Sequence, residues 1–335
     1  MYPRTADDRP ARAGPSPEGR RRAARAPRHG LRRIGTLSGL IGLCLLLWIL
    51  TPHFLTVSNL LNVLEQTSIN AVIAVGMTFV ILSGGIDLSV GSLLALAGVV
   101  MATLLHAGWP AAAAIPAGVA VGFAFGALNG LAIAWGRLPP FIATLGMMSI
   151  ARGCALLFTE GRPVSGFSAD FRSLATARVL GVPAPVVATA AVYVAARFML
   201  SSTRFGRYVY AMGGNEEATR LSGVNVRLHK TLVYGVSGFT SAVAAVLLTA
   251  RLNSAQPIAG IMYELDAIAA VVIGGTSLSG GQGGVGGTLV GALIMGVLRN
   301  GLNLLGVSSF LQQVVIGLVI VCAVLLDTVL KSRRA

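Results

Sequence analysis

The run AAAAIPAGVAVGFAFGALNGLAIAW, residues 111 to 135, contains no charged side chain and decides the class of fold. About 20 apolar residues in an α-helix span the hydrocarbon core of a bilayer, so this run is long enough to cross a membrane. The whole sequence agrees, because it is 54% hydrophobic, only 11% charged and contains 42 glycines. This composition excludes an ordinary soluble domain and predicts a polytopic membrane protein.

Further apolar runs follow one another along the chain, and several of them are short or interrupted by glycine. Together they predict an all-α polytopic membrane protein with about ten transmembrane helices. The expected spans are residues 34 to 50, 69 to 84, 88 to 106, 111 to 135, 140 to 158, 183 to 200, 231 to 250, 264 to 279, 285 to 303 and 308 to 327.

Lys and Arg are distributed unevenly among the connections between these runs. If both termini are cytoplasmic, most of the 26 basic residues fall in cytoplasmic segments. The outer loops then hold only Arg162, Arg172, Arg178 and Arg251. Positive charge favours the cytoplasmic side, so we expect an even number of spans with both termini inside. Residues 201 to 230 then form the longest internal cytoplasmic loop.

Residues 1 to 33 differ in composition from the remainder of the chain. They are rich in arginine and proline and poor in apolar residues, which predicts a disordered cytoplasmic tail. Residues 34 to 330 form the transmembrane domain. We interpret the tail as a topology determinant or a contact with anionic lipid rather than an RNA-binding arm, so the net charge of +14 requires no nucleic-acid partner.

The cysteines and histidines show no pattern of metal or redox chemistry. The cysteines lie far apart inside predicted spans, as buried small side chains do. The histidines are scattered over the tail and the connections, without the spacing of metal ligands. These residues are Cys44, Cys154, Cys322, His29, His53, His106 and His229. We therefore predict no metal and no cofactor in this chain.

One charged stretch, GGNEEATRLSGVNVRLHK at residues 213 to 230, lies in the long cytoplasmic loop. Asn215 is a good N-cap, Glu216 and Glu217 place negative charge in the first turn, and Gly223 suits a left-handed end. The pattern predicts a helix from about Glu216 to Ser222. A helix this short is marginal alone in water, so it either packs against the chain's own span ends or docks on a cytoplasmic partner protein.

Five blocks, in order, carry a family resemblance. They are GGIDLSVGSLLALAG (84 to 98), PPFIATLGMMSIARG (139 to 153), GRYVYAMGGNEEATRLSGVNV (206 to 226), SAQPIAGIMYELDAIAAVVIGGTSLSGG (254 to 281) and NGLNLLGVSS (300 to 309). The sequence resembles the permease subunit of ribose-type ATP-binding-cassette (ABC) importers over roughly residues 35 to 330. The resemblance implies a multi-pass protein of the bacterial inner membrane, a homodimer, a separate cytoplasmic ATPase and a periplasmic sugar-binding protein.

In this family the Asn-Glu-Glu loop is similar to a coupling helix that sits in a cleft of the ATPase subunit, which favours the docking interpretation. An importer needs a rigid, capped lever to convert closure of its ATPases into movement of membrane helices. The expected coupling residues are Gly214, Asn215, Glu216, Glu217, Ala218, Arg220, Ser222 and Gly223.

Two glycine-rich patterns resemble nucleotide-binding motifs. The run LSGGQ, residues 278 to 282, matches a signature of the ATPase subunits. The only two lysines, Lys230 and Lys331, follow His229 and Leu330, so neither completes a phosphate-binding loop. The pattern Gly281-x-Gly283-x-x-Gly286 lacks a βαβ context. We therefore predict that this chain is not an enzyme and that a separate subunit hydrolyses ATP.

Asp87, in SGGIDLSVGS, is a carboxylate between two apolar runs. Such a residue costs a few kcal/mol inside a membrane, so it is usually functional or lies at a span end. Asp87 can cap the third span at its cytoplasmic end or take part in gating, and the two roles are compatible.

Other polar residues offer partners for a sugar crossing the membrane. The candidates for the substrate path are Asn70, Asn129, Asn253, Gln256, Asn300 and Asn303. Each can equally hydrogen-bond a neighbouring helix. Arg251, Glu264 and Asp266 lie near the outer face, where they contact the sugar-binding protein or pair locally.

Glycines Gly118, Gly122, Gly126 and Gly130 recur every four residues in the fourth predicted span. They place small side chains along one helix face and predict close packing against another helix.

The sequence thus predicts an importer permease for a monosaccharide, with ribose favoured. Another pentose or hexose, or a branched-chain amino acid, remains an alternative substrate. A secondary transporter is disfavoured, because the centres of the expected spans hold almost no ionisable residues.

Overall fold

The computed structural model describes residues 28–332, and the statements that follow concern these residues. The described helices are α2 Arg28–Leu50, α3 Val57–Leu82, α4 Val90–His106, α5 Ala111–Ala134, α6 Pro140–Thr159, α7 Ala169–Thr176, α8 Ala184–Ser202, α9 Arg204–Gly214, α10 Glu216–Leu221, α11 Val226–Leu252, α12 Tyr263–Ile273, α13 Val285–Leu304 and α14 Ser309–Ser332. Strand β1 (Val164–Ser165) pairs antiparallel with β4 (Ser254–Ala255), and β2 (Arg178–Val179) with β3 (Val182–Pro183).

Six of the described helices are long and apolar enough to cross a membrane, namely α3, α5, α6, α8, α11 and α13. Shorter apolar helices cover Gly35–Leu50, Val90–His106 and Ser309–Cys322. The all-α polytopic class is therefore confirmed, and the structure supports six candidate spans. The count of ten stays a prediction.

Two helices differ clearly from their expected boundaries. Helix α3 begins at Val57, well before residue 69, because the Thr56 hydroxyl accepts a hydrogen bond from Asn59 N and caps a first half that is partly polar. Helix α12 ends at Ile273 rather than near residue 279, since Gly275 takes a left-handed conformation with φ of 87°. At 11 residues, α12 is too short to span a bilayer by itself.

The predicted tail also needs a correction at its boundary. Helix α2 begins at Arg28, so the last part of the segment 1 to 33 is helical rather than disordered. The remainder of the predicted tail, residues 1 to 27, lies outside the described residues.

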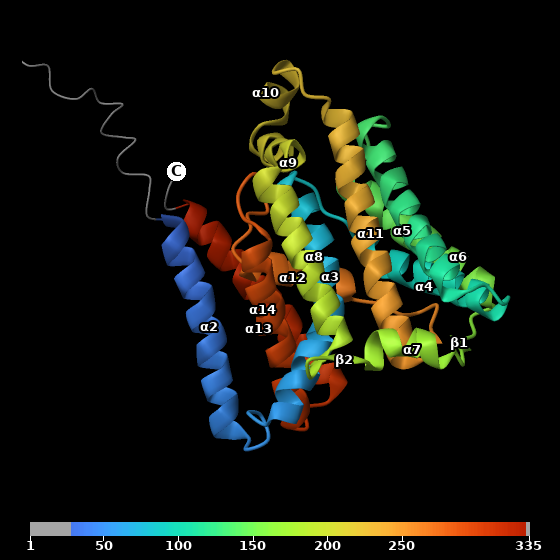
Figure 1. Ribbon diagram of the computed structural model, residues 1–335. Coiled ribbons are helices and arrows are strands. Elements are labelled where there is room, and N and C mark those ends of the chain that lie inside the picture. The colour runs from blue at the N-terminus through green and yellow to red at the C-terminus, as the bar shows by residue number, and fades with distance from the viewer. Residues whose placement is uncertain (1–27, 333–335) are drawn as a thin grey trace, which may run out of the picture.

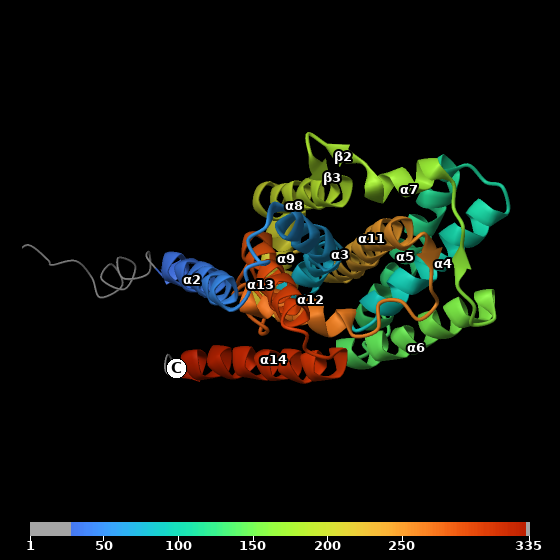
Figure 2. The ribbon, with the colours of Figure 1, turned by 90° about the horizontal axis from the view of Figure 1, so that it is seen from below.

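Helix α3 is the centre of the bundle, and Figure 2 shows it surrounded by α8, α11 and α13. Its second half is almost wholly buried, including Phe79, Ile73 and Met77 at 0% exposure. Tyr193 on α8 donates a hydrogen bond to the Ala71 carbonyl of α3 over 3.1 Å. A helix buried on all sides accounts for the nearly continuous apolar sequence of this half.

The predicted packing of the glycine stripe is confirmed. A Cβ on Gly122 would lie 2.6 Å from Ala242 Cβ and 2.7 Å from the Gly238 carbonyl oxygen, both on α11. Gly126 and Gly130 also face α11, and Gly118 faces α4. Lipid tails are as apolar as the helices, so dispersion contacts at such close approach hold α5 against α11.

The bundle has two structurally different ends (Figure 1). Helices α9 and α10 lie at one end, called the α10 end below, and α7 with the β2–β3 pair lies at the opposite one, called the α7 end. The first residues of α2 and the last residues of α14 both point toward the α10 end.

Candidate functional site

The short helix α10, Glu216–Leu221, forms at the position expected from the sequence. Asn215 is extended, with φ of −160°, and its Oδ1 accepts a hydrogen bond from Ala218 N over 2.9 Å. At the other end, Ser222 N bonds to the Ala218 carbonyl and Gly223 has a φ of 83°. The predicted cap, helix and left-handed end are therefore confirmed, and the role of this helix in coupling stays a prediction.

Helix α9 supports α10 and was not anticipated from the sequence. The Thr203 hydroxyl caps it by accepting from Gly206 N, and Val209 and Met212 are buried against the bundle at 0% and 3% exposure. Phe205 stacks on Phe79 of α3 with ring centroids 6.0 Å apart. Apolar residues spaced three to four apart between Phe205 and Met212 were the available signal.

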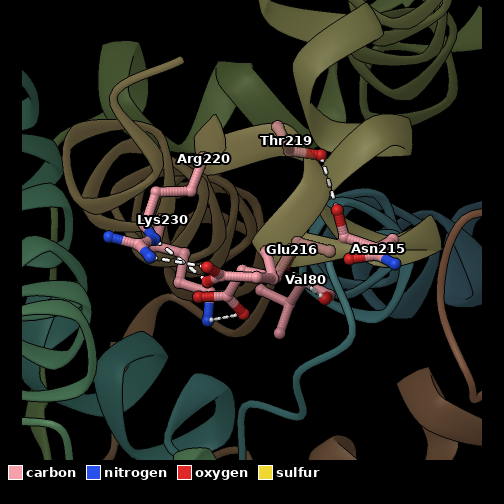
Figure 3. A network of polar contacts seen from close by, with 8 residues as sticks. Val80, Asn215, Glu216, Thr219, Arg220 and Lys230 are labelled. Atoms are coloured by element: carbon pink, nitrogen blue, oxygen red, sulfur yellow. Dashed lines mark hydrogen bonds and ion pairs between the residues drawn. The ribbon is translucent and has the colours of Figure 1, made fainter. Parts of the chain in front are cut away.

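The two glutamates of α10 both form ion pairs, and one of these pairs joins α10 to α11 (Figure 3). Lys230 Nζ on α11 lies 2.6 Å from Glu216 Oε2, and Arg220 Nη2 lies 2.5 Å from Glu217 Oε1 within α10. The hydrogen bond from Arg220 lowers the pKa of the Glu217 carboxyl below its ordinary value. Exposed ion pairs contribute little to stability because solvent screens them, so the Lys230–Glu216 pair orients α10 more than it stabilises the fold.

Most of α10 is free to meet another molecule. Thr219 is its buried residue, at 6% exposure, and its hydroxyl donates to the Asn215 carbonyl. Leu221 is 76% exposed although it is apolar. An apolar side chain among exposed charges at the tip of a capped helix is typical of a protein-docking surface.

The segment that precedes α10 touches two other helix connections, and backbone meets backbone at the closest of these contacts. A Cβ on Gly213 would overlap the Leu82 carbonyl at the end of α3 and Gly281 N in the α12–α13 connection. Gly281 N donates to Leu82 O over 2.9 Å, and Tyr210 on α9 donates to the Gly283 carbonyl. The LSGGQ run is therefore part of this junction, and a displacement of α10 acts directly on α3, α12 and α13.

Asp87 is fully buried and links three helices. Its carboxylate accepts hydrogen bonds from Ser89 N (2.9 Å), Ser89 Oγ (2.6 Å) and Ser237 Oγ on α11 (2.7 Å). Ser89 Oγ in turn accepts from Asn129 Nδ2 on α5. The prediction of Asp87 as the cap is corrected in position: Ser89 occupies the N-cap of α4, and Asp87 binds the backbone N–H of that residue from two positions earlier.

The six substrate-path candidates do not converge on one site. Asn129 belongs to the Asp87 network, Asn253 accepts from Phe167 N in the α7-end connection, and Asn300 exchanges hydrogen bonds with Asn59. Asn303 accepts from Gln312. These contacts join neighbouring helices and connections, as the alternative interpretation expected.

Of the same candidates, Asn70 and Asn303 line cavities. Asn70 Nδ2 donates to Asp266 Oδ2 over 3.2 Å, beside a cavity of about 380 Å³. Gln256 lines neither of these two cavities, and its backbone carbonyl accepts a hydrogen bond from Ala259 N.

The charges near the α7 end pair within the chain. Arg251 Nε lies 3.2 Å from Glu65 Oε1, and Arg299 Nη2 lies 2.8 Å from Asp266 Oδ2. Local pairing, one of the two expectations for Arg251 and Asp266, is therefore observed. The sequence could not identify the partners, because they lie on helices far away in the chain.

The structure is a helical bundle with six candidate membrane spans and an exposed, capped helix at one end, and comparisons with known proteins identify its family. The family described as branched-chain amino acid transport system / permease component matches residues 59–324. The chain therefore belongs to this family of transport-system permeases. It is a multi-pass protein of the inner membrane.

Individual relatives place it more narrowly. The ribose import permease protein RbsC of Escherichia coli (strain K12) is 53% identical over 296 residues, which cover 87% of this chain and 92% of the relative. The RbsC protein of Bacillus subtilis (strain 168) is 50% identical, covering 89% and 93%. The E. coli D-allose transport system permease protein AlsC is 43% identical, covering 84% and 86%. The resemblance to ribose-type ABC importer permeases is thus confirmed; no solved structure matches.

Proposed function

We propose that this chain is the permease subunit of an ABC importer that translocates a monosaccharide, with ribose as the favoured substrate. The observation that carries the proposal is the identity of 50% to 53% to ribose import permeases over nearly the whole of both chains. The allose permease is less similar, at 43%. The xylose permease XylH of E. coli, at 36%, is less similar again, so the identities favour ribose in particular.

The ATPase is a separate cytoplasmic subunit in this proposal, and α10 is the element that docks on it. The support is geometric: α10 is capped by Asn215, braced by Lys230 and exposes Leu221 at its tip. Its base meets the backbones of two other segments, the end of α3 and the α12–α13 connection, so force applied at the tip passes directly to them. No cofactor is expected in this chain itself.

The proposal includes a homodimer, about ten membrane crossings, cytoplasmic termini and a periplasmic sugar-binding protein. The direction of the chain ends supports an even number of crossings, because α2 begins and α14 ends toward the α10 end (Figure 1). Exposed apolar side chains along α14, such as Phe310 at 85% and Leu318 at 61%, are available to lipid or to the second permease copy.

A branched-chain amino acid is the second candidate substrate, because the description of the matching family names that class. Another pentose or hexose would use the same mechanism with a different binding protein. A secondary transporter is disfavoured by the family and by the exposed docking helix.

Uptake of labelled ribose tests the proposal. The permease, a cognate ATPase and its sugar-binding protein are placed in proteoliposomes with ATP inside, and unlabelled pentoses, hexoses and leucine compete. We expect ATP-dependent uptake that ribose blocks best. Uptake that needs an ion gradient and no ATP would contradict the importer, and competition by leucine alone would replace the substrate.

A double variant tests the coupling role in the same system. Glu216→Lys with Glu217→Lys reverses the charge of the α10 first turn and should abolish ATP-dependent uptake. Glu160→Lys reverses an exposed charge at the opposite end, where α6 closes, and should leave uptake unchanged. Normal uptake by the double variant would remove α10 from the coupling mechanism.

A further inference from the structure

A polar cavity lies inside the helix bundle, in the half toward the α7 end. Its volume is about 380 Å³, and its walls come from α3, α11, α12 and α13. We call it the Thr67 cavity. Its polar lining includes Gln66, Thr67, Asn70, Arg251, Asp266 and Arg299. Apolar side chains such as Leu248 and Met295 complete it. Small-molecule sites are usually cavities of this size with a few placed polar groups.

Asp266 and Arg299 form the charged part of this cavity. The Asp266 side chain is only 4% exposed, and Arg299 Nη2 lies 3.0 Å and 2.8 Å from its two carboxylate oxygens. In the part of the chain that the structure describes, only Nη2 of Arg299 forms hydrogen bonds, so Nε and Nη1 remain as donors for a further molecule. Ionisable residues inside membrane bundles are costly and typically mark substrate paths.

Two further polar atoms at this cavity lack a partner. Thr67 is only 5% exposed, and neither its Oγ1 nor Asn70 Oδ1 has a hydrogen-bond partner among the described residues. Buried polar groups are normally satisfied, and an unsatisfied one lowers stability. Unpaired groups that line a cavity are therefore available to a ligand.

The same ion pair also borders a second cavity, of about 480 Å³, which lies between α12, α13 and α14. Asn303 and Gln312 line that cavity together with Asp266 and Arg299. The pair thus stands between two polar spaces in the membrane domain. A molecule moving from one space to the other would meet the same two side chains.

The chemistry of the Thr67 cavity suits a neutral molecule with several hydroxyls. Its charges are balanced, because Arg299 pairs with Asp266 and Arg251 with Glu65. Donors on Arg299 and acceptors on Asp266, Thr67 and Asn70 lie around one space, and a hydroxyl can both donate and accept. A simple anion or cation would find no uncompensated charge of opposite sign.

We propose that the Thr67 cavity binds the transported monosaccharide, whose hydroxyls bond to Thr67, Asn70 and the Asp266–Arg299 pair. The inference rests on the proposed function, since it assigns the sugar to a place within the permease. It separates Asn70 from the other substrate-path candidates and adds Thr67 and Arg299, which sequence reasoning did not select.

Thr67→Val provides the sharpest test, because it replaces an unpaired hydroxyl by a methyl group of similar size. A purely structural role predicts equal or higher thermal stability and unchanged transport. Sugar binding predicts a fall of at least fivefold in ribose transported per ATP hydrolysed, with the melting temperature maintained. The measurement uses the complete importer in proteoliposomes, with uptake and ATP hydrolysis followed in the same vesicles.

The matched control is Thr78→Val on the same helix. Thr78 is buried, but its hydroxyl bonds to the Ala74 carbonyl and to Thr288 Oγ1, and Thr78 lines neither cavity. This variant should lower the melting temperature and leave the ribose to ATP ratio unchanged. Thr67→Val is therefore expected to change the ribose to ATP ratio alone, and Thr78→Val the melting temperature alone.

A second variant blocks the cavity without disturbing the core. Leu252 lines it and is 49% exposed, so Leu252→Trp can narrow the opening while Leu252→Ile serves as its control. We expect ribose uptake to fall only for tryptophan. If wild-type importer carries ribose and both Thr67→Val and Leu252→Trp keep the wild-type ratio, the site is overturned while the function stands. If wild-type importer carries no monosaccharide, both proposals fail.

Discussion

The two ends of the bundle differ in the space that they leave around buried polar groups. Near the α10 end, Gly213 leaves no room for a side chain, and both Asp87 carboxylate oxygens accept hydrogen bonds. Asn129 Oδ1 and the Tyr234 hydroxyl are buried and unpaired there, but neither residue lines the Thr67 cavity. In the Thr67 cavity, the unpaired Thr67 Oγ1 and Asn70 Oδ1 border open space. A close-packed region transmits a displacement because it cannot compress, whereas a polar cavity leaves room for a ligand. In the two proposals made above, force therefore enters at the α10 end and the transported sugar occupies the Thr67 cavity.

The largest effect is expected where the close packing is most demanding. Gly122→Leu pushes α5 away from α11, because a Cβ alone already comes within 2.6 Å of Ala242. We expect a loss of stability of about 3 kcal/mol or more and poor assembly, measured as melting temperature and yield in detergent. Gly39→Leu on α2, where a Cβ meets nothing within 4 Å, is the matched control. Normal stability of the Gly122 variant would show that this contact can adjust.

A change at the docking surface should affect transport without affecting the fold. Leu221→Asp places a charge on the 76% exposed tip of α10 and should lower ATP-dependent uptake at least tenfold at unchanged melting temperature. Leu180→Asp, at a fully exposed position near the α7 end, should change neither quantity. Equal uptake by both variants would argue that α10 does not carry force.

A substitution at Asp87 can distinguish a structural role of this side chain from a role of its negative charge in gating. Asp87→Asn retains an oxygen for Ser89 N–H but weakens bonds that a charged acceptor strengthens, so we expect a loss of about 1 to 3 kcal/mol. Most transport should survive, as measured by uptake per folded protein. A variant that is folded yet inactive would instead assign the negative charge itself to gating.

The smallest effect concerns the cap of α10. Asn215→Ala removes the acceptor for Ala218 N and should weaken the helix by about 1 kcal/mol, without lowering the melting temperature of the bundle. Faster hydrogen exchange confined to residues 216 to 221 would report the change. Asn215→Asp keeps a capping oxygen and should restore protection; no difference between the two variants would exclude the cap as the source of stiffness.

Local features were predictable from the sequence, whereas features that depend on how the helices are rotated and positioned against one another were not. The apolar runs identified the membrane class, and Asn215 with Gly223 defined α10, because each signal lies within a few adjacent residues. Helix α12 ended early because Gly275 turns the chain, and the predicted span 264 to 279 had included the polar residues Thr276, Ser277 and Ser279 that follow this turn. The same limit applied to α9, whose amphipathic pattern is mixed with charges.

The Thr67 cavity was the least predictable feature. Thr67, Asp266 and Arg299 come from three helices, and only their rotation and depth bring them together. Asn70 was selected as a polar residue in an apolar run, but nothing in the sequence distinguished it from Asn300, which pairs with Asn59 instead. Side chains on neighbouring helices decide whether a buried amide is structural or open to a ligand.

The junction beneath α10 also restricts which substitutions this sequence can accept during evolution. Gly213 faces the Leu82 carbonyl, while Gly280 and Gly281 both need a left-handed backbone and pack against Gly213 and Gly214. A side chain gained at Gly213 would displace all three segments at once. A homologue in which another residue replaces Gly213 must therefore also change the end of α3 and the α12–α13 connection. We expect these positions to vary together among homologues rather than one at a time.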